Sequence, residues 1–214
     1  MNDDRLLSHT LRIGGGIVAG YVLGTFPSAD LAARFADTDT DVRKVGSNNP
    51  GALNVATSLS KWLGVAVLGA DVVKGVLAGR VGRSLAGGTG ANLASAAAVA
   101  GHCYPAFPAG RTGGKGVSTS VGQVIATFPR YLPLDFAVGA ATALLPKWTQ
   151  RTWAATAAAS ATWVTASTVA YARGWRTGTD AQAPLALPLA SAVSSAIIAK
   201  RFLDTPLEDG KPKT

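Results

Sequence analysis

Apolar segments separated by short polar stretches make up most of this chain. Seven are rich in Ala, Val and Leu, at residues 11–35, 62–79, 85–100, 117–128, 134–145, 152–171 and 183–198. A helix that crosses a bilayer needs roughly 20 mostly apolar residues, so the two shortest, 117–128 and 134–145, are the weakest candidates. Pro27 is expected to kink the first one. The pattern predicts an all-α integral membrane protein with about seven transmembrane helices.

The scarcity of charge supports this interpretation. Charged residues make up 15% of the 214 residues and apolar residues 48%, whereas soluble domains average about 25% charged residues. The net charge of +8 would also suit a nucleic-acid-binding protein, but no basic arm or aromatic–basic interleaving accompanies it. Membrane proteins carry excess Lys and Arg on cytoplasmic loops, and a basic pocket suits phosphate ligands. We therefore expect membrane lipid as a partner and no nucleic acid.

The chain is expected to form one domain, because no tandem repeat or linker divides it. Residues 1–204 are predicted to be a single polytopic membrane domain and residues 205–214 a polar C-terminal tail. The acidic start is not typical of a signal peptide. With the N-terminus outside, the inside loops hold more Lys and Arg than the outside ones. This orientation places both glycine-rich loops on the cytoplasmic side of the cell membrane.

The first of these loops reads DVRKVGSNNPGALNV, residues 41–55. Its glycines, Gly46 and Gly51, allow the backbone to approach a ligand closely. The side chains that suit a phosphate group are Arg43, Ser47, Asn49 and Asn54. The same stretch is a good turn signal, so an ordinary turn-rich loop at the membrane surface is the alternative.

The second loop carries Gly-Gly-Lys-Gly at residues 113–116, directly before a predicted helix start. A Walker A motif is excluded, because position 109 is Ala and a glycine follows the lysine. Flexible backbone around Lys115, next to a helix N-terminus, still suits a phosphate group. His102 lies upstream and, as a lone histidine, is interpreted first as an interfacial residue at a helix end.

Two charged residues, Asp71 and Lys74, lie inside the apolar segment 62–79. A charge at the centre of a bilayer costs about 2.5–3.5 kcal/mol on insertion scales. Three residues apart, the two side chains share one helix face. They are interpreted as a pair that compensates its own charge and supports a nearby site, or as a pair that shapes a polar pocket.

Four motifs occur in a fixed order along the first half of the chain. They are GSNNPGALNV at 46–55, DVVKG at 71–75, GHCYPAF at 101–107 and GGKGVST at 113–119. Together they resemble the bacterial membrane glycerol-3-phosphate acyltransferase (PlsY) family over about residues 17–123.

The resemblance implies a seven-helix membrane enzyme that transfers an acyl group from acyl phosphate to the 1-hydroxyl of glycerol 3-phosphate. The products would be lysophosphatidic acid and inorganic phosphate, at the start of phospholipid synthesis. No cofactor or metal is implied, and Cys103 with two His residues gives no set of zinc ligands and no intramolecular disulfide. The resemblance also allows a contact with the enzyme that produces acyl phosphate.

The resemblance makes Ser47, His102 and Lys115 the catalytic candidates. His102 would deprotonate or orient the hydroxyl, Ser47 would hydrogen-bond the substrate, and Lys115 would bind phosphate. A covalent acyl-Ser47 is the less favoured alternative. Asp71 and Lys74 would give structural support. The predicted substrate-binding residues are Arg43, Gly46, Asn49, Gly51, Asn54, Gly113, Gly114, Gly116 and Thr119.

The sequence also departs from the family pattern. The replaced positions are Asn48 (usually Gly), Leu53 (usually Thr), Thr57 (usually Arg) and Thr112 (usually Lys or Arg). The last helix lacks the expected His and Asn, and its loose counterparts are Lys200, Arg201 and Glu208. Two alternatives therefore stay open. One is a catalytically weak or inactive relative that binds a phospholipid precursor or a membrane partner, and the other is a transporter for phosphorylated solutes, although no inverted repeat is visible.

Overall fold

The fold is helical throughout the part of the chain described by the computed structural model, residues 3–36, 40–107, 111–145, 151–177 and 182–205. The α-helices are α1 (Asp3–Gly24), α2 (Ser28–Phe35), α3 (Ala52–Ser58), α4 (Lys61–Cys103), α5 (Val117–Thr127), α6 (Leu132–Leu144), α7 (Arg151–Ala172) and α8 (Ala186–Asp204), and one 3₁₀ turn, η1 (Pro129–Tyr131), joins α5 to α6. The seven predicted apolar segments are thereby confirmed as helical. Of the predicted C-terminal tail, residues 206–214 lie outside the described residues.

Pro27 does more than kink the first segment. Helix α1 ends at Gly24 and α2 begins at Ser28, so the chain makes a complete break between them. Proline fixes its own φ and has no N–H to continue the hydrogen-bond ladder of α1. The short helix α2 buries Ala29, Ala32 and Ala33 against an apolar cluster that includes residues of α3 and α4. The break therefore turns the chain so that α2 packs beside the first glycine-rich loop.

Helix α4 is a hairpin of two helices, which agrees with the separate predicted segments 62–79 and 85–100. The turn lies at Ala86 and Gly87, whose backbone leaves the helical region. Gly87 has φ +60° and ψ −148°, a combination that is essentially restricted to glycine. Beyond the turn the two halves lie so close that a Cβ on Gly82 would collide with the backbone of Gly90.

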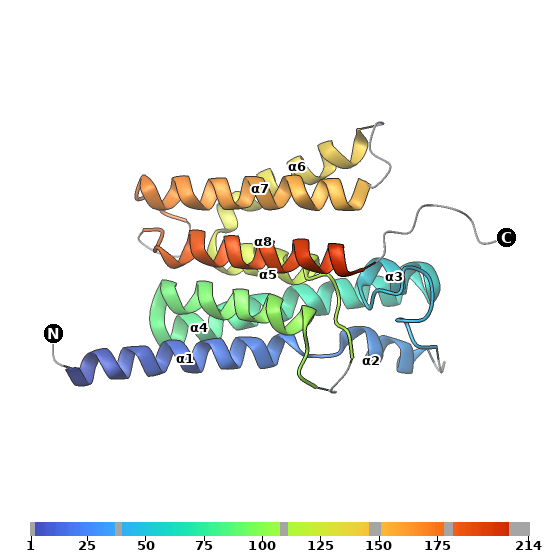
Figure 1. Ribbon diagram of the computed structural model, residues 1–214, viewed down its shortest axis with the longest axis horizontal. Helices are drawn as coiled ribbons and strands as arrows, with labels where there is room; N and C mark the ends of the chain where they lie inside the picture. Colours follow the sequence, from blue (N-terminus) through green and yellow to red (C-terminus); the bar gives the residue numbers. More distant parts are fainter. Residues whose placement is uncertain (1–2, 37–39, 108–110, 146–150, 178–181, 206–214) are drawn as a thin grey trace.

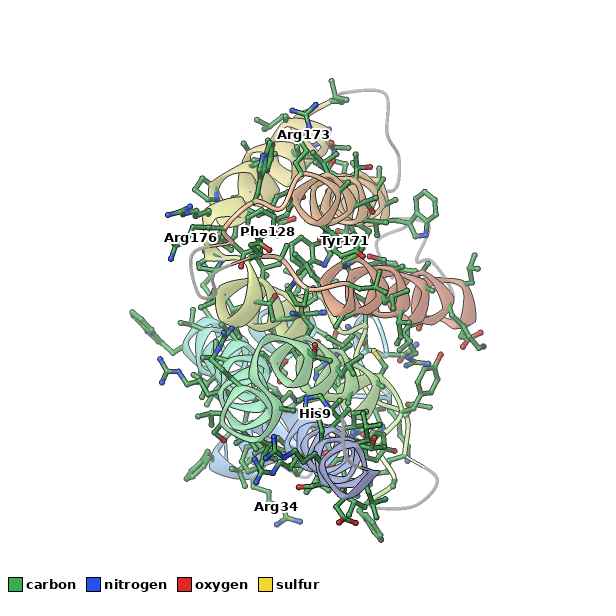
Figure 2. The ribbon with its side chains drawn as sticks, turned by 90° about the vertical axis from the view of Figure 1, so that its left-hand side faces the viewer. His9, Arg34, Phe128, Tyr171, Arg173 and Arg176 are labelled. Atoms are coloured by element: carbon green, nitrogen blue, oxygen red, sulfur yellow. The ribbon has the colours of Figure 1, made fainter. Side chains whose placement is uncertain are left out.

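The helices pack in layers that Figure 1 shows from the side. Helix α1 lies along α4 on one side of the bundle. Helices α5 and α8 form the middle layer, and α6 and α7 lie on the far side. The closest packing is between α1 and α4, where Gly20 and Gly24 face Ala94 and Ala98 without room for a Cβ. Small residues allow this approach between helices in lipid. Figure 2 looks along the bundle from the end where α1 begins and where Arg173 and Arg176 follow α7.

The outer surface suits lipid. Within the described ranges, three stretches are long and apolar enough to cross a membrane, Asp4–Phe35, Lys61–Cys103 and Ala186–Asp204. Large apolar side chains of α1, including Leu11, Val18 and Val22, stay exposed along its outer face. Such a face is unusual for a soluble protein and expected for a helix in contact with acyl chains.

Candidate active site

The side chain of Asn54, on α3, makes several hydrogen bonds to the backbone of the first glycine-rich loop. Its amide nitrogen donates to the carbonyl oxygens of Val42 at 2.8 Å and Val45 at 3.1 Å. Its amide oxygen accepts the backbone N–H of Ser47 at 2.9 Å. Asn54 is only 2% exposed, so its hydrogen bonds fix the loop. The prediction that it also contacts substrate stays a prediction.

The second glycine-rich loop rests directly on the end of α4. The N–H of Gly114 donates to the carbonyl oxygen of His102 at 3.2 Å. A Cβ on Gly113 would collide with that same carbonyl, and a Cβ on Gly114 would collide with Nε2 of the His102 ring. Glycine is therefore required here for close approach. The contact places His102 against the loop that carries Lys115.

A buried ionic cluster lies behind His102. The carboxylate oxygen Oδ1 of Asp71 accepts a hydrogen bond from Ser28 Oγ at 2.5 Å and lies 3.0 Å from Lys74 Nζ. His102 Nδ1 is 3.6 Å from the same oxygen. Lys74 also donates to the Phe26 carbonyl at 3.2 Å. Asp71 and Lys74 are 1% and 5% exposed, so each offsets the charge of the other, and one ring nitrogen of His102 faces Asp71 while the other faces the glycine loop.

Arg43, a predicted phosphate-binding residue, is engaged by a carboxylate. It forms a two-pronged ion pair with Asp30 on α2, with N–O distances of 2.5 and 3.1 Å. Its Nε donates to the carbonyl of Thr112 at 2.8 Å, and Arg111 lies 3.2 Å from the same Asp30. Asp30 thus joins the two glycine-rich loops through two arginines. Nothing local in the sequence marks Asp30, because its partners lie on loops distant in sequence.

A cavity of about 490 Å³ opens beside these loops. Its lining includes polar and cationic side chains, namely Ser47, Asn49, Lys61, His102 and Lys115. It also includes apolar side chains, among them Leu53, Val65 and Leu68 from α3 and α4. A smaller pocket of about 30 Å³ lies on the other side of His102 and is lined by Ser28, Asp30, Arg43, Lys74 and Arg111. His102 lines both spaces.

The structure brings most predicted site residues to these two spaces. Ser47, Asn49, Gly51, Asn54, Asp71, His102, Lys115 and Gly116 line the large cavity, and Arg43, Lys74, Gly113 and Gly114 line the small pocket. Two residues are placed elsewhere. Gly46 has φ +56° and packs against Asn54, and Thr119 is fully buried between α5 and α4. A role for these two would act through the backbone or through helix packing.

The last helix contributes residues that the motifs did not identify. Phe202 lines the large cavity, and Lys115 Nζ lies 4.4 Å from the centre of its ring. Arg201 reaches the carbonyls of the second glycine-rich loop. Lys61, at the start of α4, also lines the cavity. The sequence shows that Lys61 and Arg201 lie at the ends of apolar segments. It does not show that α8 approaches the second glycine-rich loop.

Comparison with known proteins identifies the family. A family model described as glycerol-3-phosphate acyltransferase matches residues 15–202. The chain belongs to the glycerol-3-phosphate acyltransferase family. A glycerol-3-phosphate acyltransferase of Thermoanaerobacter sp. (strain X514) is 37% identical over 131 residues, which cover 61% of this chain and 65% of that protein. One of Rubrobacter xylanophilus is 42% identical over 114 residues, covering 53% and 56%. These alignments span less than two thirds of the relatives' own length.

Solved structures of this acyltransferase family share the fold. The crystal structure of the integral membrane glycerol 3-phosphate acyltransferase PlsY in its glycerol 3-phosphate form matches with a TM-score of 0.71 and 28% identity, covering 90% of this chain and 88% of that one. Its lysophosphatidic acid form matches with a TM-score of 0.69 and 26% identity. The structural likeness thus extends into the C-terminal half, where the sequence departs from the family pattern.

Proposed function

We propose that this protein transfers a fatty acyl group from acyl phosphate to the 1-hydroxyl of glycerol 3-phosphate. The products are lysophosphatidic acid and inorganic phosphate, and the reaction begins phospholipid synthesis. The observation that carries the proposal is the cavity of about 490 Å³, whose lining combines cationic and hydrogen-bonding side chains with apolar ones. An acyl phosphate needs both kinds of contact, because it has a charged head and an apolar chain.

The proposed reaction consists of three events. The hydroxyl oxygen of glycerol 3-phosphate attacks the carbonyl carbon, the bond from that carbon to the phosphate oxygen breaks, and the hydroxyl proton leaves. Lys115 offsets the charge on the departing phosphate. His102 takes or orients the proton through the ring nitrogen that faces the glycine loop, while Asp71 lies 3.6 Å from the other nitrogen. Ser47 and the backbone of the two loops hold the substrates in line.

Two anionic substrates repel each other, so their binding needs more than one cation. Lys115 and Lys61 line the large cavity, and Arg43, Lys74 and Arg111 line the small pocket on the other side of His102. Asp30 and Asp71 partly neutralise this second group. Arg43 therefore binds phosphate in competition with Asp30. Under this proposal Arg43 draws the anion towards His102, and Lys115 holds the leaving group.

The same proposal places the protein in the cell membrane as one domain over residues 1–204. Seven spans are formed by α1, the two halves of α4, α5, α6, α7 and α8. The N-terminus is outside, and the glycine-rich loops face the cytoplasm, where glycerol 3-phosphate is available. The acyl phosphate reaches the cavity from the lipid side or from a contact with the enzyme that produces it.

An assay with purified protein in lipid tests the activity. Palmitoyl phosphate and glycerol 3-phosphate are supplied, and both lysophosphatidic acid and inorganic phosphate are measured. Lys115→Ala is expected to remove nearly all product, whereas Lys200→Ala, at an exposed position on α8, should leave the rate unchanged. Equal loss in both variants, or no product from folded parent protein with several acyl phosphates, would contradict the proposal.

A second candidate function is that of a binding protein with little or no catalysis. Its support is position 57, where the family usually has Arg. Thr57 Oγ donates to the Leu53 and Asn54 carbonyls of its own helix, so no cation is supplied there. The last helix also lacks the family's His and Asn. Binding of glycerol 3-phosphate or lysophosphatidic acid by calorimetry, with no turnover, would favour this candidate over the enzyme.

A further inference from the structure

The last turn of α8 is joined to the Gly-Gly-Lys-Gly loop by one buried side chain, Arg201. Its Nη2 donates to the carbonyl oxygen of Gly113 at 2.7 Å, and its Nε donates to the carbonyl oxygen of Gly114 at 3.2 Å. The residue is 8% exposed. These hydrogen bonds connect positions 87 and 88 residues apart in sequence. One guanidinium thus fixes two consecutive peptide groups of the loop.

Fixing the carbonyls also fixes the N–H groups. In a planar trans peptide, the C=O of one residue and the N–H of the next point in opposite directions. When Gly113 and Gly114 direct their carbonyls at Arg201, the N–H groups of Gly114 and Lys115 point away from α8. The first donates to the His102 carbonyl. The second belongs to Lys115, which lines the large cavity.

The contact requires the shape of arginine. A guanidinium presents several N–H donors in a rigid plane and can hold two acceptors at once, whereas a lysine ammonium acts as a point charge. The guanidinium also lies 5.5 Å from the centre of the Tyr104 ring, which restricts its orientation. Among the described residues, no carboxylate forms an ion pair with Arg201. Its positive charge therefore adds to the potential around the loop.

We propose that Arg201 is a positioning residue, which holds residues 113–116 in the conformation that binds phosphate. The inference deepens the proposed acyltransferase function, and its kinetic consequence rests on that function. Its structural consequence, the order of the loop, does not.

The test compares Arg201→Lys and Arg201→Ala with the matched control Lys200→Ala. Lys200 is the preceding residue, and its exposed side chain pairs with Asp204. Hydrogen exchange of the amides in residues 111–118 is measured in protein purified in lipid, together with binding of inorganic phosphate. Exchange of amides in α1 and α6 reports whether each variant is folded.

Losing hydrogen bonds to a charged donor is expected to speed exchange of the Gly114 amide, which donates to the His102 carbonyl, about tenfold or more in Arg201→Ala. Arg201→Lys keeps the positive charge but loses the planar pair of N–H donors that holds both carbonyls. The loop amide should therefore also exchange faster in this variant than in the parent. Phosphate binding should weaken about tenfold in parallel. In active protein, the specificity constant for acyl phosphate should fall by a similar factor in both Arg201 variants and not in the control.

Unchanged loop exchange in both folded Arg201 variants would overturn the proposal. Unchanged phosphate affinity with faster exchange would also overturn it, since the loop would then be ordered by Arg201 without serving phosphate. If the parent protein shows no acyltransferase activity, exchange and phosphate binding still decide the question. Failure of the proposed function and failure of this inference are therefore separate results.

Discussion

Replacing Asp71 by Asn tests the buried ionic cluster behind the candidate site. The substitution keeps the size of the side chain but removes the charge that lies 3.0 Å from Lys74 Nζ. Lys74 is 5% exposed, so its ammonium has little contact with water. Removing one partner of a buried ion pair costs about 3–5 kcal/mol, because the other charge is left uncompensated. Ser28 Oγ and His102 Nδ1 also lose the anionic oxygen that they face.

The free energy of unfolding in detergent is the appropriate measurement, followed by tryptophan fluorescence. Asp71→Asn should lower it by about 3–5 kcal/mol, and Asp71→Leu combined with Lys74→Met should recover most of the loss, because neither charge remains buried. Asp204→Asn serves as the control, since it breaks an exposed ion pair with Lys200 and such pairs contribute little. A loss below about 1 kcal/mol in Asp71→Asn, or a double variant no more stable than the single one, would refute the argument.

Three glycines give further predictions. Gly114→Ala should nearly abolish acyl transfer while the helices stay folded, because its Cβ would collide with the His102 ring; product formation measures this, and a parent-like rate would contradict the contact. Gly87→Ala should destabilise the α4 hairpin by about 1–3 kcal/mol, since Gly87 has φ +60° in open space and conformational strain is the only cost. Gly69→Ala, also without close neighbours but inside a regular part of α4, should be neutral or stabilising by up to about 1 kcal/mol. Thermal unfolding of the two variants isolates the cost of the positive φ at Gly87, because an added Cβ is uncrowded at both positions.

Much of the fold followed from the composition and length of the apolar segments. The helices begin and end within a few residues of the predictions for α4 to α7, because lipid-facing segments must satisfy their backbone groups internally. The structure departs from the predictions where local chemistry is polar. Pro27 separates two helices, and α3 begins inside the loop that the turn signals described, since Asn54 completes the loop with side-chain bonds that no periodicity reveals.

The site shows a similar limit. The two glycine-rich stretches that the sequence marked lie beside His102 in the structure, and their role in binding substrate stays a prediction. The ionic partners left no such mark. Asp30 engages Arg43 from α2, and Arg201 reaches the second loop from α8. Contacts between elements far apart in the chain depend on how the helices pack, which one sequence alone does not specify.

The hairpin within α4 limits the insertions and deletions that the sequence can tolerate during evolution. Asp71 and Lys74 lie before the turn and His102 lies after it, so the turn at Gly87 sets their register. Inserting or deleting one residue between the turn and His102 would rotate the histidine by about 100° and shift it by about 1.5 Å. The ring would then leave both Asp71 and the glycine loop. The length of this stretch is therefore constrained as strictly as its small buried side chains.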